Sequence, residues 1–156
     1  MVEFHKVASD KTYLAIGRFM SEFSQVEYTI RHYLAEEISL DESHFDAIIG
    51  SYDAALLCSV AREVFSKSRA ETNSRAIAKM LNKFLDLNGN RNRVAHGLWV
   101  SSKDGGTVHY APRSRPAYHI SGNQAKSLEK LADELIKLRA NLEREFTSPC
   151  PDTGKS

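Results

Sequence analysis

Apolar residues recur at steps of three and four positions along the first part of the chain, from about Asp10 to Leu40. The positions that share this spacing are Ile16, Phe19, Met20, Phe23, Val26, Ile30 and Leu34. Such steps place side chains on one face of a helix with about 3.6 residues per turn. The segment is therefore predicted to be one long amphipathic helix, and the fold is predicted to be built from helices.

Two further helical segments follow in the middle of the chain. One extends from about Glu42 to Ser66, and Gly50 either divides it or lies within it. The other restarts the helical spacing near Ile77 and ends at His96, because the Gly97 that follows is a common helix stop. Residues 88–90, with the turn-like sequence Asn-Gly-Asn, either interrupt this helix or are carried within it.

The last helix is predicted from its cap and its leucine spacing. Ser121 is followed three positions later by Gln124, which is the pattern of a capping box. Leucines at alternating steps of three and four then form a packing seam, at Leu128, Leu131, Leu135, Leu138 and Leu142. Because the seam covers only about two heptads, it favours packing inside a bundle over a free coiled coil.

Two β-prone segments, residues 98–100 and 107–110, flank a polar run with two glycines and predict a small hairpin. The predicted fold is all-α, a bundle of four to five helices with a small β-hairpin insert before the last helix. Residues 1–146 are expected to form a single domain. Residues 147–156 contain two prolines and a glycine and are expected to be a disordered tail.

Composition excludes several classes of protein. The longest uninterrupted apolar run, residues 54–58, is far shorter than the roughly 18 residues that span a membrane. The N-terminus lacks the apolar stretch of a secretory signal, and Cys58 and Cys150 form neither a disulfide framework nor a cluster with metal-ligand spacing. We therefore expect a cytoplasmic protein with no membrane segment, no metal and no cofactor.

Charge is distributed unevenly, although the formal net charge is only +1. Residues 1–61 carry 4 basic and 10 acidic side chains, and residues 62–119 carry 11 basic and 4 acidic ones. The basic middle segment can present a surface to phosphate. The acidic and basic segments can equally pair within the fold or across a dimer, and charge alone leaves both readings open.

Functional side chains are densest at residues 90–97, at the end of the third predicted helix. Asn92 and His96 are four positions apart and share one side of that helix, with Arg91 within reach of both. Arg91 also falls inside the apolar stripe, where an uncompensated charge is costly. Since Glu27 lies on the apolar line of the first helix, we hypothesise that Glu27 lies near Arg91 and orients it.

Arg91 and Asn92, three intervening residues, and His96 followed by Gly97 resemble the R-x4-6-H motif of the HEPN superfamily. HEPN domains are all-α bundles of four or five helices, usually dimeric, with the motif near the end of a core helix. The helical background predicted here is similar. The close match covers residues 91–97, and a loose resemblance extends over about residues 10–146.

This resemblance implies a metal-independent endoribonuclease that leaves 2′,3′-cyclic phosphate ends, with Arg91, Asn92 and His96 as catalytic residues. By that likeness His96 acts as general acid or base on the ribose 2′-OH and the leaving 5′-oxygen, and Arg91 stabilises the scissile phosphate. The resemblance also implies a homodimer whose two sites face each other, toxin, defence or stress-response use, and an antitoxin or other regulatory protein as partner.

The chemistry of these residue types agrees with that activity. Histidine exchanges protons near neutral pH, and a guanidinium offers a planar, permanently charged fork to phosphate. Asn92 is suited to orienting His96 or the phosphate. A metal-free mechanism uses the RNA's own 2′-OH, so DNA is expected to be a poor substrate.

Further RNA contacts are expected from Arg93, Lys103, Arg113 and Arg115, for which the alternative is a solvated surface. For the motif itself, the alternative is a helix-end network in which His96 caps the helix and Arg91 holds a dimer. The competing function is a non-catalytic dimerisation or adaptor module, or a protein that binds RNA or nucleotide without cutting it.

Overall fold

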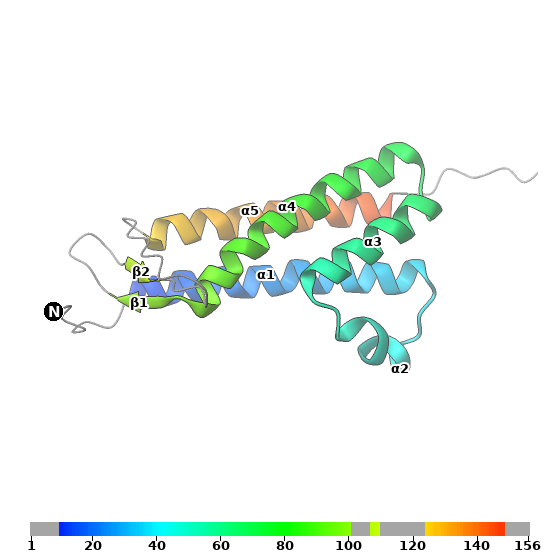
Figure 1. Ribbon diagram of the computed structural model, residues 1–156. Helices are drawn as coiled ribbons and strands as arrows, with labels where there is room; N and C mark the ends of the chain where they lie inside the picture. The colour runs from blue at the N-terminus through cyan, green and yellow to red at the C-terminus, as the bar shows by residue number, and fades with distance from the viewer. Residues whose placement is uncertain (1–9, 101–106, 110–123, 149–156) are drawn as a thin grey trace, which may run out of the picture. The chain divides into compact units, whose positions relative to one another are not determined.

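The computed structural model of the chain describes residues 10–100, 107–109 and 124–148 (Figure 1). Within these residues the fold is all-α apart from two short strands. The elements in chain order are α1 (Asp10–Glu37), α2 (Glu42–Phe45), the π-helix η1 (Asp46–Gly50), α3 (Ala54–Ser68), α4 (Glu71–His96), β1 (Leu98–Val100), β2 (Thr107–His109) and α5 (Gln124–Thr147).

The two helices with the clearest apolar spacing are confirmed. In α1, the predicted stripe is buried except for Ile16 and Met20, which are half-buried. Phe19, Val26, Ile30 and Leu34 are each 0% exposed. In α5, the leucine seam is buried except for Leu131, which is half-buried. The capping residue predicted at position 121 lies outside the described residues.

The backbone closes the C-terminal end of α1 with two hydrogen bonds that fold back over its last turn. The amide of Ser39 donates to the carbonyl of Glu36 at 3.0 Å, and the amide of Leu40 donates to the carbonyl of Ala35 at 2.9 Å. This pair of bonds is the Schellman pattern, in which the residue after the cap is left-handed. Here that residue is Ser39, with φ of 53°.

The predicted second helix is divided at Gly50, one of the two alternatives that its sequence left open. Aspartates begin both helices on either side of the division: the side chain of Asp41 accepts a hydrogen bond from the amide of His44 in α2, and that of Asp53 accepts one from the amide of Leu56 in α3. Each carboxylate satisfies an amide that has no partner inside its helix. The five-residue π-helix η1 ends at Gly50 and had no sequence signal.

The third predicted helix is one continuous helix, α4, and it carries residues 88–90 within it. Glycine inside a helix costs about 1 kcal/mol relative to alanine. The apolar residues around the triplet, including Phe84, Leu87 and Val94, are buried, and their packing outweighs that cost. The helix begins at Glu71, six residues before the apolar spacing becomes visible at Ile77.

Two three-residue strands lie where the sequence predicts a hairpin. β1 and β2 pair antiparallel, with Trp99 opposite Val108. The polar run between them lies outside the described residues. The tail expected to be disordered from residue 147 begins later than predicted, because Thr147 is the last residue of α5, and residues 149–156 lie outside the described residues.

The chain divides into two compact units: Met1–Phe23 with Leu87–Leu135, and Ser24–Asp86 with Ile136–Ser156. We call them the first and second units. The helices α1, α4 and α5 each contribute residues to both. The prediction of a single domain over residues 1–146 stays a prediction.

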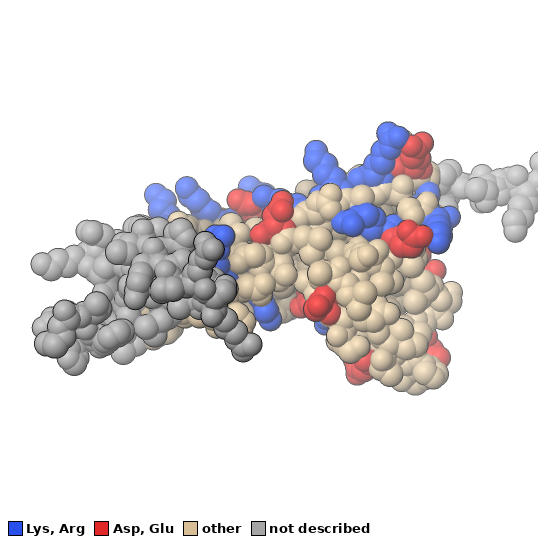
Figure 2. Space-filling view, in the orientation of Figure 1, with Lys and Arg blue, Asp and Glu red and all other residues tan. Residues whose placement is uncertain are grey.

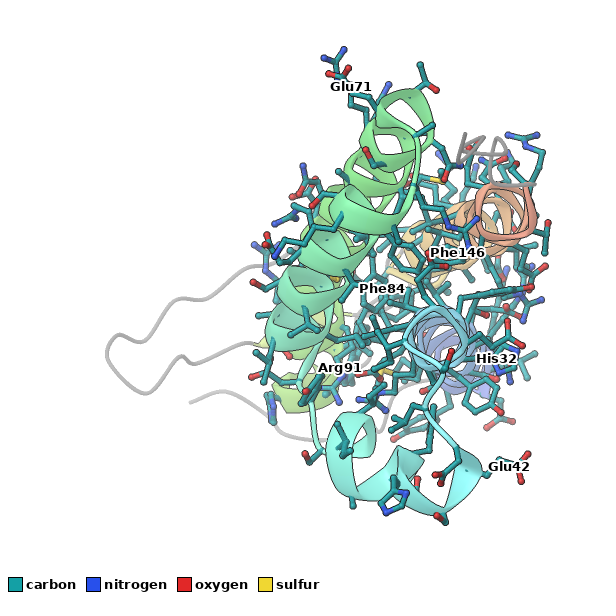
Figure 3. The ribbon with its side chains drawn as sticks, turned by 90° about the vertical axis from the view of Figure 1, so that its right-hand side faces the viewer. His32, Glu42, Glu71, Phe84, Arg91 and Phe146 are labelled. Atoms are coloured by element: carbon teal, nitrogen blue, oxygen red, sulfur yellow. The ribbon has the colours of Figure 1, made fainter. Side chains whose placement is uncertain are left out.

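Each unit is held by apolar helix faces. In the first unit the buried residues include Phe19, Leu87 and Leu128, and an ion pair of 2.7 Å between Arg18 and Asp133 joins α1 to α5 at the surface. In the second unit, Phe146 of α5 stacks on Tyr33 of α1 and on Phe65 of α3, with ring centroids 4.8 and 4.9 Å apart. Figure 3 shows Phe84 and Phe146 pointing into the interior of that second unit. Among the described residues, no helix is long and apolar enough to cross a membrane.

Candidate functional site

The residues of the predicted motif lie at the C-terminal end of α4, in the first unit. Arg91 is half-buried and follows the buried Leu87 by one turn, as its place in the apolar stripe predicted. Its Nη1 donates a hydrogen bond of 3.2 Å to Oδ1 of Asn92. Figure 3 labels Arg91 on the lower part of α4. The side-chain amide of Asn92 therefore holds the Arg91 guanidinium through one of the N–H groups of the guanidinium.

His96 is the last residue of α4, and its side chain is exposed. An exposed imidazole can reach a ligand, whereas one enclosed by aliphatic side chains cannot. A proton-transfer role requires an accessible ring, and Arg91, five positions earlier on the same helix, is itself partly accessible.

The single tryptophan of the chain holds the end of α4. Its indole Nε1 donates to the backbone carbonyl of Val94 at 3.1 Å, and the ring is half-buried. The last four carbonyls of a helix have no partner inside the helix, so this bond satisfies one of them. Trp99 thereby fixes the helix end on which His96 lies.

Glu27 belongs to the second unit, where its carboxylate pairs with Arg31 on the same helix. Its Oε1 accepts a hydrogen bond from Nη2 of Arg31 at 3.0 Å, and the same nitrogen donates to the backbone carbonyl of Tyr52 at 2.6 Å. The two side chains are only 22% and 20% exposed. The pairing of Glu27 with Arg91 stays a prediction.

Of the expected RNA contacts, only Arg93 lies among the described residues, and its side chain is exposed at the end of α4. Lys103, Arg113 and Arg115 lie outside the described residues. Their expected contribution to RNA binding therefore stays a prediction.

A second cluster brings together the residue types of a serine hydrolase without their geometry. At the start of α2, the hydroxyl of Ser43 donates to Oδ1 of Asp41 at 2.5 Å, and Nδ1 of His44 lies 2.8 Å from the same oxygen. These two hydrogen bonds lower the pKa of the Asp41 carboxyl, that from Ser43 first. A catalytic serine instead donates to the ring nitrogen that the carboxylate does not hold. The cluster is therefore a helix cap.

Sequence reasoning missed the polar atoms that are buried without a hydrogen-bond partner among the described residues. They are Glu22 Oε2, Arg31 Nε and Asn73 Oδ1. Glu22 lies in the first unit, and its neighbour Phe23 belongs to the apolar face of α1. Because adjacent helix residues point about 100° apart, that neighbour alone gives no sign that a Glu22 oxygen is buried.

The described residues contain no group of three or more His, Cys, Asp or Glu side chains that could hold a metal ion. Comparison with protein-family models, with curated proteins and with solved structures found nothing that matches this chain.

Proposed function

We propose that this protein is a metal-independent endoribonuclease of the HEPN type, which cleaves RNA to 2′,3′-cyclic phosphate ends. The observation that carries the proposal is the arrangement at the end of α4, an exposed His96 with a half-buried Arg91 five positions earlier on the same helix. The all-α fold, with the motif at the end of a long helix, supports it.

In this mechanism the chain supplies a proton carrier and a fixed positive charge. His96 moves a proton between the ribose 2′-OH and the leaving 5′-oxygen, which is the task of a general acid or base. Arg91 stabilises the phosphate as its charge grows in the transition state. Asn92, which accepts a hydrogen bond from Arg91, positions the guanidinium. The proposed active form is a homodimer, with an antitoxin or another regulatory protein as a further partner.

The test is incubation of the purified protein with single-stranded RNA in EDTA, with cyclic-phosphate ends as the readout. Cleavage is expected with RNA and not with DNA of the same sequence, because DNA lacks the 2′-OH. His96→Ala and Arg91→Ala are each expected to lower the rate by about 100-fold or more. Both variants should keep the circular dichroism spectrum of the wild type.

Two matched controls separate these roles from general loss of charge. His44→Ala removes another exposed histidine, in α2, and Arg75→Ala removes an arginine that is 77% exposed on α4. Neither should change the rate by more than about twofold, since exposed side chains away from a site have small effects. Intact RNA with folded wild-type protein would instead favour the non-catalytic module, and an RNA-binding assay would then tell an adaptor from a binder.

A further inference from the structure

Helix α3, in the second unit, is apolar on two sides. One side is in the core, with Ala54, Leu57, Cys58, Ala61 and Phe65 all buried. A second stripe follows at steps of four: Leu56 is 48% exposed, and Val60 and Val64 are half-buried. A helix that covers its apolar side within one domain usually presents polar residues elsewhere. The second stripe therefore indicates a surface that meets another partner.

Charged residues continue this stripe at both ends, and their signs differ. Asp53 precedes Leu56 by three positions, and Lys67 follows Val64 by three. Both are exposed; Lys67 is 74% exposed, although it also contacts Glu63 at 2.6 Å on its own helix. Along the helix, the stripe therefore begins with an acidic residue, continues with three apolar residues and ends with a basic residue.

The chain segments before and after the stripe differ in charge in the same direction, acidic before it and basic after it. Residues 36–53 contain six acidic residues and no lysine or arginine, whereas residues 62–83 contain six basic and two acidic ones. Figure 2 shows tan with scattered red around α2 and η1, and Lys and Arg toward the upper right, where α3 ends. The ion pair between Glu37 and Arg69 joins the two segments. Most of the other charged side chains in both segments are exposed.

We propose that the second stripe of α3 binds the same stripe of a second copy, with the two helices antiparallel and Val60 at the twofold axis. In that register Leu56 meets Val64 of the partner subunit, and Asp53 meets Lys67 of the partner subunit. A twofold contact requires a self-complementary surface, and the spacing of this stripe is symmetric about residue 60. A parallel pair would instead place like charges opposite each other. The inference does not depend on RNA cleavage.

The expected association is weak. The 15 residues of α3 span about 22 Å at 1.5 Å per residue. A stable interface usually covers about 800 Å² on each partner, more than one stripe of this length supplies. The dimer should therefore dissociate on dilution.

Sedimentation equilibrium of the full chain without RNA, over a range of concentrations, tests the surface. Leu56→Lys places a charge in the stripe and should raise the dimer dissociation constant about tenfold or more. Leu14→Lys is the matched control, since Leu14 is 76% exposed on α1, and it should leave the constant unchanged. Lys67→Glu, which sets a second acid against Asp53, should raise the constant by up to about fivefold.

Disulfide trapping tests the register. In a Cys150→Ser background, Val60→Cys should cross-link to the same residue of a second copy under mild oxidation, because only near the axis do identical residues meet. Ser66→Cys, an exposed position on another side of α3, is the control and should cross-link much more slowly. The remaining Cys58 is fully buried and does not compete.

A wild-type protein that stays monomeric at about 100 μM, above the micromolar range of weak complexes, overturns the proposal and leaves the stripe to a different protein. A dimer that Leu56→Lys does not weaken, or equal cross-linking at positions 60 and 66, also overturns it. A dimer that Leu56→Lys does not weaken would leave the homodimer of the ribonuclease proposal in place on another surface. A monomeric wild type would remove that homodimer as well, and the RNA cleavage assay would then decide the ribonuclease proposal by itself. A protein that forms this dimer but does not cleave RNA would support the dimer and contradict the ribonuclease proposal.

Discussion

Ser39 is the one described residue other than glycine with a positive φ, and it closes the Schellman turn after α1. A side chain with a Cβ is strained in the left-handed region, and glycine is not. The sequence around α1 predicted the helix but not this turn, because its usual marker is a glycine and here the position is a serine.

Ser39→Gly is therefore expected to stabilise the protein by about 0.5–1 kcal/mol, since it removes the strain and keeps both backbone hydrogen bonds. Urea unfolding followed by circular dichroism measures the change. Ser51→Gly is the matched control: Ser51 has φ of −82°, so glycine there gains nothing and adds flexibility to the unfolded chain. A loss of stability in Ser39→Gly equal to that in Ser51→Gly would contradict the explanation.

At the scale of elements, one ion pair joins three helices of the second unit. Arg69, the C-cap of α3, makes hydrogen bonds to both carboxylate oxygens of Glu37 at the end of α1 and donates to the carbonyl of Ser148 at 3.1 Å, directly after α5. Its guanidinium also lies 5.8 Å from the centre of the Phe65 ring. The two charged side chains are 14% and 12% exposed. Two nearly buried charges that satisfy each other are costly to separate.

This pair makes stability depend on pH in a definite direction. The hydrogen bond from Arg69 lowers the pKa of Glu37 below its usual 4.5, against the opposing effect of burial. Glu37 therefore stabilises the fold fully above that unfolded-state value, and the contribution is lost as pH falls through the lower folded-state pKa. Glu37→Gln should cost about 1–3 kcal/mol at pH 7, and its difference from wild type should shrink as the pH falls below 4.5.

Urea unfolding at several pH values measures this difference. Glu71→Gln is the matched control, because Glu71 pairs with Arg75 on α4 while both side chains are 77% exposed. Such a surface pair contributes about 0.5 kcal/mol or less. If Glu37→Gln and Glu71→Gln lowered the free energy of unfolding equally at every pH, burial of the Glu37 pair would not be the source of its effect on stability.

The same elements show what the sequence could and could not predict. Periodic apolar residues predicted α1 and α5 almost to their ends. The helix stop at Gly97 predicted that Arg91, Asn92 and His96 lie in the last turns of one helix, and all three are in α4, where Arg91 donates a hydrogen bond to Asn92. The contact of Glu37 with Arg69 joins residues 32 positions apart. The sequence around Glu37 does not indicate that Arg69 is its partner, or the reverse. The same is true of Arg31 and Tyr52. Contacts of this kind follow from packing, which single-sequence spacing does not encode.

For the whole molecule, the open question is whether the two units unfold together. α1, α4 and α5 each place residues in both units. Helix formation is cooperative along a continuous segment, so loss of one unit removes packing from helices that the other unit needs. We therefore expect one two-state transition for the chain, as for most small single domains.

Each unit holds a natural reporter of this transition. Trp99 lies in the first unit, and its indole bond to Val94 makes its fluorescence sensitive to unfolding there. Cys58 lies in the second unit, fully buried, and burial raises the pKa of its thiol to about 12. In a Cys150→Ser variant, a thiol reagent should therefore react with Cys58 only after unfolding.

Trp99 fluorescence and Cys58 labelling in urea should give the same midpoint of unfolding. Midpoints separated by more than about 0.5 M, beyond the usual error of such curves, would mean that the two units unfold independently.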